Sequence, residues 1–153
     1  MRHDLSQTES SLPVQQSWQR STAAGVSREL GAAPLVLNDD ALCVAREKSD
    51  WLALAREVIA PQLDTVKDSG HVLTLFDAAG RMLNSAGDPF VLESLDDIHF
   101  IPGADWSEAA TGTNGPGTAL ATGKPAHIVG ADHFVTAYHP WHCAAVPVRG
   151  PAG

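Results

Sequence analysis

Three observations predict an α+β fold for this chain of 153 residues. Apolar residues recur at the spacing of an amphipathic helix in the first half, most clearly between Trp51 and Ile59. Short apolar runs bounded by turn residues follow in the second half, beginning with residues 71–76. The length suits one domain, and helices that precede strands are typical of a layered α+β arrangement.

The N-terminal part is expected to be a polar tail followed by a short helix and a loop. Residues 1–12 are polar and rich in Ser, Gln and Thr, so we expect a frayed tail. Pro13 fits the first turn of a short helix, and residues 26–37 contain the Gly and Pro breakers of a loop. We therefore divide the chain into a polar tail with a short helix, residues 1–37, and a main domain, residues 38–153.

The helical region after this loop carries an apolar stripe. Asn38 is a good N-cap for its start, and Pro61 should kink or split it because proline removes a helical hydrogen bond. The stripe falls at positions i, i+3, i+4, i+7 and i+8, which are Trp51, Leu54, Ala55, Val58 and Ile59. It is either a face of the domain core or a dimer seam, and we expect a mixture of both.

Apolar runs and turn signals predict the remaining elements. The turn at residues 77–80 separates two strands of a hairpin, and residues 85–106 are expected to be rich in loops. The expected elements are, in chain order, strands at 71–76 and from residue 81, a helix at 115–122, a strand at 126–129, a loop or short helical turn at 130–140 and a strand at 143–148.

Composition excludes several classes of protein. A formal net charge of −8 with only 10 basic residues argues against a segment that grips nucleic acid by itself. No signal-peptide pattern and no apolar run long enough for a membrane span are present. The two cysteines, Cys43 and Cys143, are far apart. A reduced cytoplasmic protein is the simplest interpretation.

The segment Thr111–Leu120 holds three glycines, three threonines and a proline, and then becomes apolar. Asn114 is a good N-cap for the helix that follows. The segment is either a tight loop that begins a helix, or a helix N-terminus whose N–H groups face a small polar or anionic ligand.

Further motifs lie around this segment in a definite order. They are Ser17-Trp18-Gln19-Arg20-Ser21, Pro102-Gly103, Trp106-Ser107-Glu108, Asp132-His133-Phe134, Trp141-His142-Cys143 and Ala145-Val146-Pro147-Val148. Together with the glycine-rich segment, this order resembles the GAF sensor domain of sigma-54-dependent transcriptional activators, in particular the acetoin and glycerol catabolism regulators. The resemblance covers about residues 17–153. Gly115-Pro116 departs from the family's Ala plus aliphatic residue, and Asp132 stands where Glu is common.

The resemblance implies a GAF-like (PAS-related) antiparallel sheet with helices on one side and a ligand pocket between the sheet and the loops of the other face. It implies a small-molecule effector, a homodimer, and AAA+ and DNA-binding domains in the full-length regulator. In the family, residues such as 149–153 form a turn that leads into further strands. We therefore expect a sheet that lacks its final strand or strands, and a chain less stable than a longer one.

The resemblance also indicates a set of ligand-binding residues. Tryptophans at such positions line pockets or fill cores equally well, and the His and Cys of the set act either as ligand contacts or as buried structural groups. Glu108 faces the same cavity or is a solvated acid at a helix start, whereas Trp18 and Arg20 are expected to pack the first helix. The expected pocket residues are Trp106, Thr113, Asn114, His133, Trp141 and Cys143.

Other chemistries fit the sequence less well. His133, His139, His142 and Cys143 invite zinc, but adjacent His142 and Cys143 would point to opposite faces of a strand and the paired Cys-x-x-Cys spacing is absent. We expect no metal, no cofactor and no catalytic residues, because no nucleophile–base–acid set, P-loop or carboxylate pair is present. The alternatives are a haem, redox or metal sensor and a ligand-free dimerisation module.

Overall fold

The computed structural model of the chain describes residues 10–151. The expectations for the first nine residues of the polar tail, and for the last two residues of the expected C-terminal turn, lie outside the described residues. The α-helices are α1 (Leu12–Ala23), α2 (Asp39–Glu47), α3 (Asp50–Ile59), α4 (Leu63–Val66), α5 (Pro89–Asp96), α6 (Glu108–Thr111) and α7 (Gly115–Thr122). The strands are β1 (Val72–Phe76), β2 (Met82–Gly87), β3 (Ala126–Val129) and β4 (His142–Ala145). Three short 3-10 turns are η1 (Ala60–Gln62), η2 (Gly130–Asp132) and η3 (Thr136–Tyr138).

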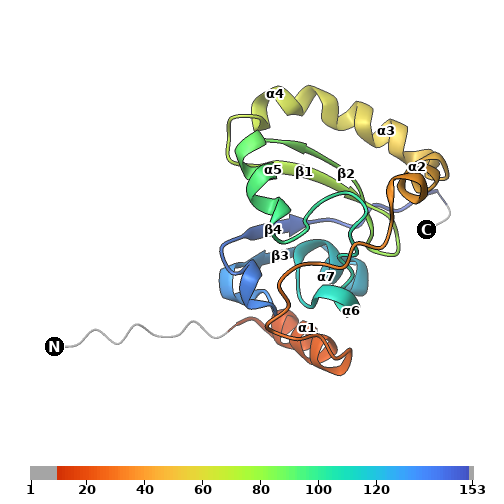
Figure 1. The fold of residues 1–153 in the computed structure, drawn as a ribbon. Coiled ribbons are helices and arrows are strands. Elements are labelled where there is room, and N and C mark those ends of the chain that lie inside the picture. The colour runs from red at the N-terminus through yellow and green to blue at the C-terminus, as the bar shows by residue number, and fades with distance from the viewer. Residues whose placement is uncertain (1–9, 152–153) are drawn as a thin grey trace.

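Two antiparallel hairpins form the centre of the molecule (Figure 1). β1 pairs with β2 from Val72↔Gly87 onward, with a register shift between Leu75 and Phe76. β3 pairs with β4 from Ala126↔Ala145 onward. In the part of the chain that the structure describes, the two hairpins are separate two-stranded sheets rather than one sheet.

Helices cover the two hairpins from opposite ends of the molecule. α2 and α4 contact β2, and α7 contacts both β3 and β4. α1 packs on α6. In Figure 1, α3 and α1 lie at opposite ends of the molecule. The α+β fold is thus confirmed. Between residues 10 and 151, none of the helices combines the length and the apolar character needed to cross a bilayer.

The main core lies where α5, the loops before α6 and the η3 turn meet. Phe100, Trp106 and Tyr138 form an aromatic chain in which neighbouring ring centroids are 4.8 Å apart. The buried members of this core are Ala33, Met82, Leu95, Ile98, Phe100, Ala104, Trp106, Phe134, Val135 and Tyr138. A second, smaller cluster of Leu42, Leu52 and Leu83 fixes α2 and α3 to β2. Burial of this apolar surface, at roughly 25 cal/mol per Å², is the main force that holds the layers together.

Most of the apolar stripe of α3 faces away from the core. Trp51, Leu54 and Val58 are 41, 64 and 65% exposed, and Ala55 and Ile59 are half-buried. The buried residue of α3 is Leu52, which lies outside the predicted stripe and packs in the small core. The expected core face is thus reduced to the half-buried Ala55 and Ile59, and the dimer seam stays a prediction. Pro61 splits the helix as expected, because the chain passes through η1 before α4 begins.

Two sequence-based expectations were wrong at the level of elements. Residues 85–106 are not mainly loop, since β2 continues to Gly87 and α5 follows at once. The Asp88 side chain caps α5 by accepting from the N–H of Phe90, and Pro89 occupies the first helical turn. β4 ends at Ala145 rather than Val148, because its partner β3 has only four residues.

Candidate functional site

The glycine-rich segment is a buried turn between two short helices. Every residue from Thr111 to Ala119 is buried. Asn114 is the predicted N-cap of α7, and its Oδ1 accepts from the N–H of Gly117 at 2.9 Å. Its Nδ2 donates to Trp106 O, Thr111 Oγ1 and Gly112 O at 2.9–3.1 Å. Because these contacts are made within the protein, the tight-loop interpretation of this segment is favoured over an anion site.

Two glycines make this turn possible. Gly112 has φ of 72°, a conformation that L side chains rarely adopt, and it lies against Phe134. At Gly117, a Cβ atom would stand 2.6 Å from Trp106 O and 2.7 Å from the Glu108 amide nitrogen. The start of α7 therefore packs directly on the start of α6.

Glu108 stands at the first turn of α6 and is only 6% exposed. Its carboxylate forms an ion pair with Arg20 of α1, in which Arg20 Nε donates to Oε1 and Nη2 donates to Oε2 at 3.1 Å. This hydrogen-bonded pairing raises the pKa of Arg20 above its ordinary value. Glu108 is neither solvated nor facing an open cavity, and Arg20 does more than pack its own helix.

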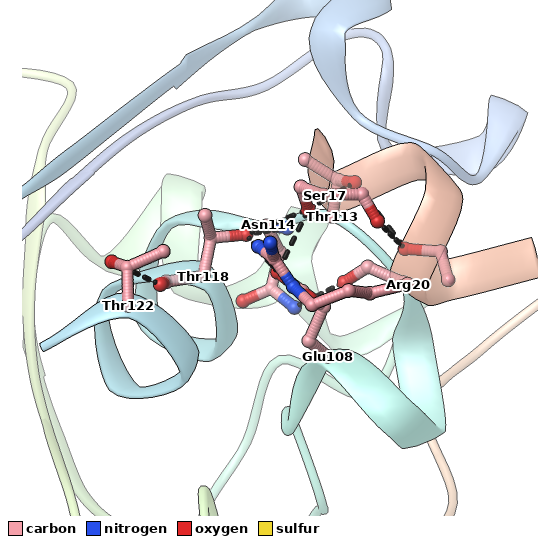
Figure 2. Close-up of polar contacts among 9 residues, drawn as sticks. Ser17, Arg20, Glu108, Thr113, Asn114, Thr118 and Thr122 are labelled. Atoms are coloured by element: carbon pink, nitrogen blue, oxygen red, sulfur yellow. Dashed lines mark hydrogen bonds and ion pairs between the residues drawn. The ribbon is translucent and has the colours of Figure 1, made fainter. Parts of the chain in front are cut away.

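Hydroxyl groups complete the surroundings of the carboxylate (Figure 2). Ser17 Oγ donates to Glu108 Oε2 at 2.7 Å, and Thr118 Oγ1 donates to the same oxygen at 2.9 Å. Thr113 Oγ1 lies 2.6 Å from Ser17 Oγ and 3.3 Å from Ser21 Oγ. We call Ser17, Arg20, Ser21, Glu108, Thr113 and Thr118 the polar junction. It ties one face of α1 to the turn between α6 and α7.

A second contact holds α1 beside η2. Trp18 Nε1 donates to the carbonyl oxygen of Asp132 at 2.8 Å, and Ser10 Oγ donates to the Asp132 carboxylate at 2.8 Å. The Arg28 guanidinium lies 5.4 Å from the Trp18 ring and 4.2 Å from the Phe134 ring. Such cation–π contacts add roughly 0.5–1 kcal/mol each at exposed sites.

The predicted residues Trp106 and His133 lie in the main core on either side of Tyr138. The Trp106 ring centroid is 4.8 Å from that of Tyr138, and Trp106 Nε1 donates to His99 O at 2.9 Å. His133 is 1% exposed, its ring meets that of Tyr138 edge-on at 6.3 Å, and its Nδ1 donates to Gly130 O. Burial is the main cause that lowers the pKa of His133, so the ring is held neutral.

Trp141 and Cys143 are half-buried around the start of β4. Trp141 packs against the main core. Cys143 lies beside Gly115, and burial raises the pKa of its thiol. His142 is exposed while Cys143 faces inward, as the strand alternation predicts. Within residues 10–151, no group of three or more His, Cys, Asp or Glu is placed to hold a metal ion.

The six predicted pocket residues thus occupy one continuous region. Asn114 bonds to the carbonyl of Trp106, and the N–H of Phe134, next to His133, donates to Thr113 O at 3.3 Å. The amide of Asn114 and the hydroxyl of Thr113 already have protein partners. A surface hollow of about 520 Å³ lies elsewhere, along α1 at Gln15, Trp18, Gln19, Thr22 and Ala23. Another, of about 290 Å³, lies on the face of the β3–β4 hairpin.

Sequence reasoning missed the contribution of Ser17, Ser21, Thr118 and Tyr138. Ser17 and Ser21 are one helical turn apart, on the same face as buried Val14, so helical periodicity could have placed both inside. Their partners lie about ninety residues away in the sequence. No local pattern reveals such a pairing.

Comparison with known proteins identifies the fold. The structure superposes on DhaR(N) in the crystal structure of the E. coli DhaR(N)–DhaL complex with a TM-score of 0.83. The two share 21% sequence identity, and the match covers 90% of this chain and 47% of that one. The fold is that of a GAF-like sensor domain. The chain belongs to the family of the MimR N-terminal domain, whose model matches residues 5–153.

Curated relatives agree with this assignment. The chain is 34% identical over 141 residues to the acetoin dehydrogenase operon transcriptional activator AcoR of Bacillus subtilis, and 32% identical over 139 residues to the propane 2-monooxygenase operon transcriptional activator MimR of Mycolicibacterium smegmatis. It is 37% identical over 139 residues to an uncharacterised protein from the thcA 5′ region of Rhodococcus erythropolis. These matches cover 90–92% of this chain, but 23, 23 and 32% of the three relatives. The chain therefore spans less than a third of the length of these relatives, two of which are named as transcriptional activators of catabolic operons.

Proposed function

We propose that this chain is the effector-sensing domain of a bacterial sigma-54-dependent transcriptional activator. It binds a small neutral molecule around the six pocket residues and controls AAA+ and DNA-binding domains that are not part of this sequence. It acts in the cytoplasm, catalyses no reaction and makes no direct contact with nucleic acid. The relatives named as activators of acetoin and propane operons support this proposal.

The polar junction is the observation that carries the proposal. α1 is held on the domain mainly by small polar side chains, since its buried residues are Val14, Ser17 and Ser21. Buried polar contacts require strict geometry, so a small displacement of Glu108 or Thr113 breaks several hydrogen bonds at once. Packed elements of this kind shift between discrete arrangements rather than deform continuously. α1 can therefore change its position when the turn before α7 shifts.

In this function the two parts of the chain have separate roles. Residues 10–23, which include α1, form an arm whose position reports the state of the domain, and the part of the chain that carries the six pocket residues binds the ligand. The contacts of Trp18 and Ser10 with Asp132 tie the same arm to the loop that follows β3. Both attachments of the arm thus lead to segments that carry predicted pocket residues.

We further propose that the domain forms a homodimer through the outer face of α2 and α3. On α2 the exposed large apolar side chain is Val44, and on α3 they are Trp51, Leu54 and Val58. The last three are spaced as one face of a helix, and contiguous exposed apolar surface of this kind marks interaction sites. A second copy of the same face would cover it.

A thermal-shift experiment on the 153-residue chain tests the sensing function. The probes are acetoin, glycerol, propan-2-ol and acetone, with acetate as a charged control. A bound ligand at about 100 times its Kd stabilises the folded state by ~2.7 kcal/mol, which raises Tm by roughly 5–10 °C for a domain of this size. We expect at least one neutral probe to do so in a saturable manner and acetate to have no effect.

A ligand-free dimerisation module is the second candidate. It is favoured by the hydrogen bonds that Asn114 and Thr113 already make within the protein. A chain that dimerises through α2 and α3 while none of the four neutral probes changes Tm would support this candidate and contradict the sensing function.

A further inference from the structure

The hydroxyl group of Tyr138 is buried without a hydrogen-bond partner. Tyr138 is 1% exposed and its Oη makes no hydrogen bond in the structure. Among residues 10–151, Ser85 Oγ is the other buried side-chain oxygen in this condition. Tyr138 is also the single tyrosine of the chain.

A tyrosine whose hydroxyl makes no hydrogen bond destabilises the core. A buried polar group that makes no hydrogen bond costs about 1–3 kcal/mol, and phenylalanine would fill the same place without this cost. Burial also raises the pKa of Tyr138 to about 12, so the group stays an uncharged donor. The hydroxyl can therefore form a hydrogen bond with a group that the protein itself does not supply.

The surroundings of Tyr138 are apolar and uncharged. The Trp106 ring lies 4.8 Å away and tilted by 47°, and the His133 ring meets the tyrosine edge-on. Burial keeps His133 neutral. The other buried members of this core have aliphatic or aromatic side chains, or, at Met82, a thioether. Such a site disfavours a carboxylate or an ammonium group, and it suits a small molecule with one or two neutral oxygens.

We propose that Tyr138 Oη forms a hydrogen bond with a hydroxyl or carbonyl oxygen of a small neutral effector whose carbon atoms lie against Trp106. This inference rests on the proposed sensing function and adds to it the polar contact and the chemical class of ligand. Two of the predicted pocket residues, Asn114 and Thr113, already bond to the protein. Tyr138, which was not among the predicted pocket residues, has a hydroxyl without a partner.

The effector gains room when the segment around Tyr138 moves. η3 is a single 3-10 turn, and the N–H groups of Tyr138 and His139 bond to carbonyls three residues back within the same segment. A backbone bond to a distant segment, from Thr136 N–H to Arg28 O, holds the turn on the loop after α1. His139 Nε2 also donates to His133 O, and the Tyr138 carbonyl accepts from the Trp141 N–H, so entry of the effector requires these bonds and the packing of buried Tyr138 to rearrange.

A single isotope label allows NMR to observe the Tyr138 hydroxyl carbon directly. Incorporation of tyrosine labelled with ¹³C at the ring carbon that bears the hydroxyl gives one resonance, because the chain has one tyrosine. The 153-residue chain is titrated with acetoin, glycerol, propan-2-ol and acetone, and acetate is the charged control. We expect a saturable shift of this resonance with the same neutral probe that raises Tm.

Tyr138→Phe and Ser85→Ala form a matched pair, since each removes a buried hydroxyl that has no partner. We expect both variants to fold with a Tm no lower than that of the unmodified chain. Tyr138→Phe should weaken binding of the active neutral probe at least about tenfold, the loss of one well-formed hydrogen bond. Ser85→Ala should leave the Kd unchanged.

The outcomes separate the two proposals. A neutral probe that raises Tm but leaves the tyrosine resonance and the Kd of Tyr138→Phe unchanged overturns this inference and leaves the sensing function intact. If none of the neutral probes raises the Tm of the unmodified chain, the sensing function itself fails. Binding of acetate through Tyr138 would overturn the assignment of a neutral ligand.

Discussion

Asn114 closes the turn between α6 and α7 with both ends of its side-chain amide. Replacement by alanine removes the cap on Gly117 and leaves the buried carbonyls of Trp106 and Gly112 without this donor. Loss of a cap costs about 0.5–2 kcal/mol and buried unsatisfied groups cost about 1–3 kcal/mol. We predict that Asn114→Ala lowers the free energy of unfolding by about 3 kcal/mol, measured by urea denaturation.

Asn38→Ala is the matched control for this prediction. Asn38 also caps a helix, through the N–H of Ala41, but it is exposed and makes this one side-chain bond in the structure. Its loss should cost about 1 kcal/mol. Equal effects at the two positions would show that the additional bonds of Asn114 contribute nothing to stability.

His133 makes stability depend on pH. Its pKa is lowered in the folded state, whereas the unfolded value is about 6.5. Below that pH the unfolded chain binds more protons than the folded one, so the free energy of unfolding decreases as the pH falls. His133→Asn keeps a donor for Gly130 O but does not titrate. We predict a smaller loss of stability for this variant between about pH 6.5 and pH 5.

The control for the pH effect is His127→Asn, because His127 is exposed on β3. Each of the two variants lacks one histidine, so a difference between their stability curves reports the burial of His133. If His133→Asn loses as much stability between about pH 6.5 and pH 5 as the unmodified chain, the burial of His133 has no effect on its pKa.

Residues whose roles are local could be predicted from the sequence, and those with distant partners could not. Asn114 follows a local capping rule, and its role as the N-cap of α7 is confirmed. Glu108 was placed at a helix start, but its partner Ser17 lies 91 residues away in the sequence. Tyr138 carries no motif at all, and only the packed structure shows that its hydroxyl has no partner.

At the scale of elements, the close packing of α6 and α7 depends on Gly117. A methyl group there would meet Trp106 O, Asn114 Nδ2 and the Glu108 amide at 2.6–2.7 Å. Such overpacking typically costs 1–3 kcal/mol. We predict that Gly117→Ala lowers the free energy of unfolding by about 3 kcal/mol. In Gly31→Ala, where a Cβ atom has nothing within 4 Å, the change should stay within about 0.5 kcal/mol.

Comparison of the urea midpoints of these two variants tests the packing of the helix pair. A stable Gly117→Ala variant would mean that α7 can move away from α6 without loss, and the polar junction would then not be a tightly fixed unit.

The elements that could be predicted are those with a strong local period or cap. The start of α2 at the cap Asn38, the split at Pro61 and the span of α7 follow from such signals. α5 was missed because residues 85–106 were predicted to be rich in loops, although Pro89 after the capping Asp88 begins a helix. β4 is shorter than predicted because strand length depends on the partner strand, which periodicity does not reveal.

At the scale of the whole molecule, the outer face of α2 and α3 is the predicted dimer surface. A charge at Leu54 and Val58, which are 64 and 65% exposed, would be buried without a partner in the dimer. We predict that the double variant Leu54→Glu, Val58→Glu sediments as a monomer with an unchanged circular dichroism spectrum. Phe90→Glu is the control, because Phe90 is 80% exposed but lies on α5.

This prediction has a clear contrary result. If the unmodified chain already sediments as a monomer at high micromolar concentration, or if the double variant remains a dimer, the outer face of α2 and α3 is not the dimer surface.

The α+β architecture could be predicted from the order of helices and strands, but its division into two hairpins could not. A turn joins β1 to β2, and a segment with the 3-10 turns η2 and η3 joins β3 to β4, whereas the pairing of hairpins with each other depends on the whole chain. The expected further strand and its effect on stability stay predictions. The predicted pocket residues lie together because the aromatic core brings the segments around residues 106, 114, 133 and 141 to one place.

Hydrogen exchange of the α1 amides, with and without acetoin, tests most directly whether the polar junction transmits a signal. η3 contacts η2, which carries Asp132, and the Asp132 carbonyl anchors Trp18, so a shift of η3 by an effector beside Tyr138 would also disturb this attachment of α1. We therefore predict that acetoin speeds exchange in residues 12–23 while it slows exchange around η3, and that Glu108→Gln makes α1 exchange fast in both conditions. Bound acetoin, detected by a raised Tm, with unchanged exchange in α1 would contradict the role of this helix.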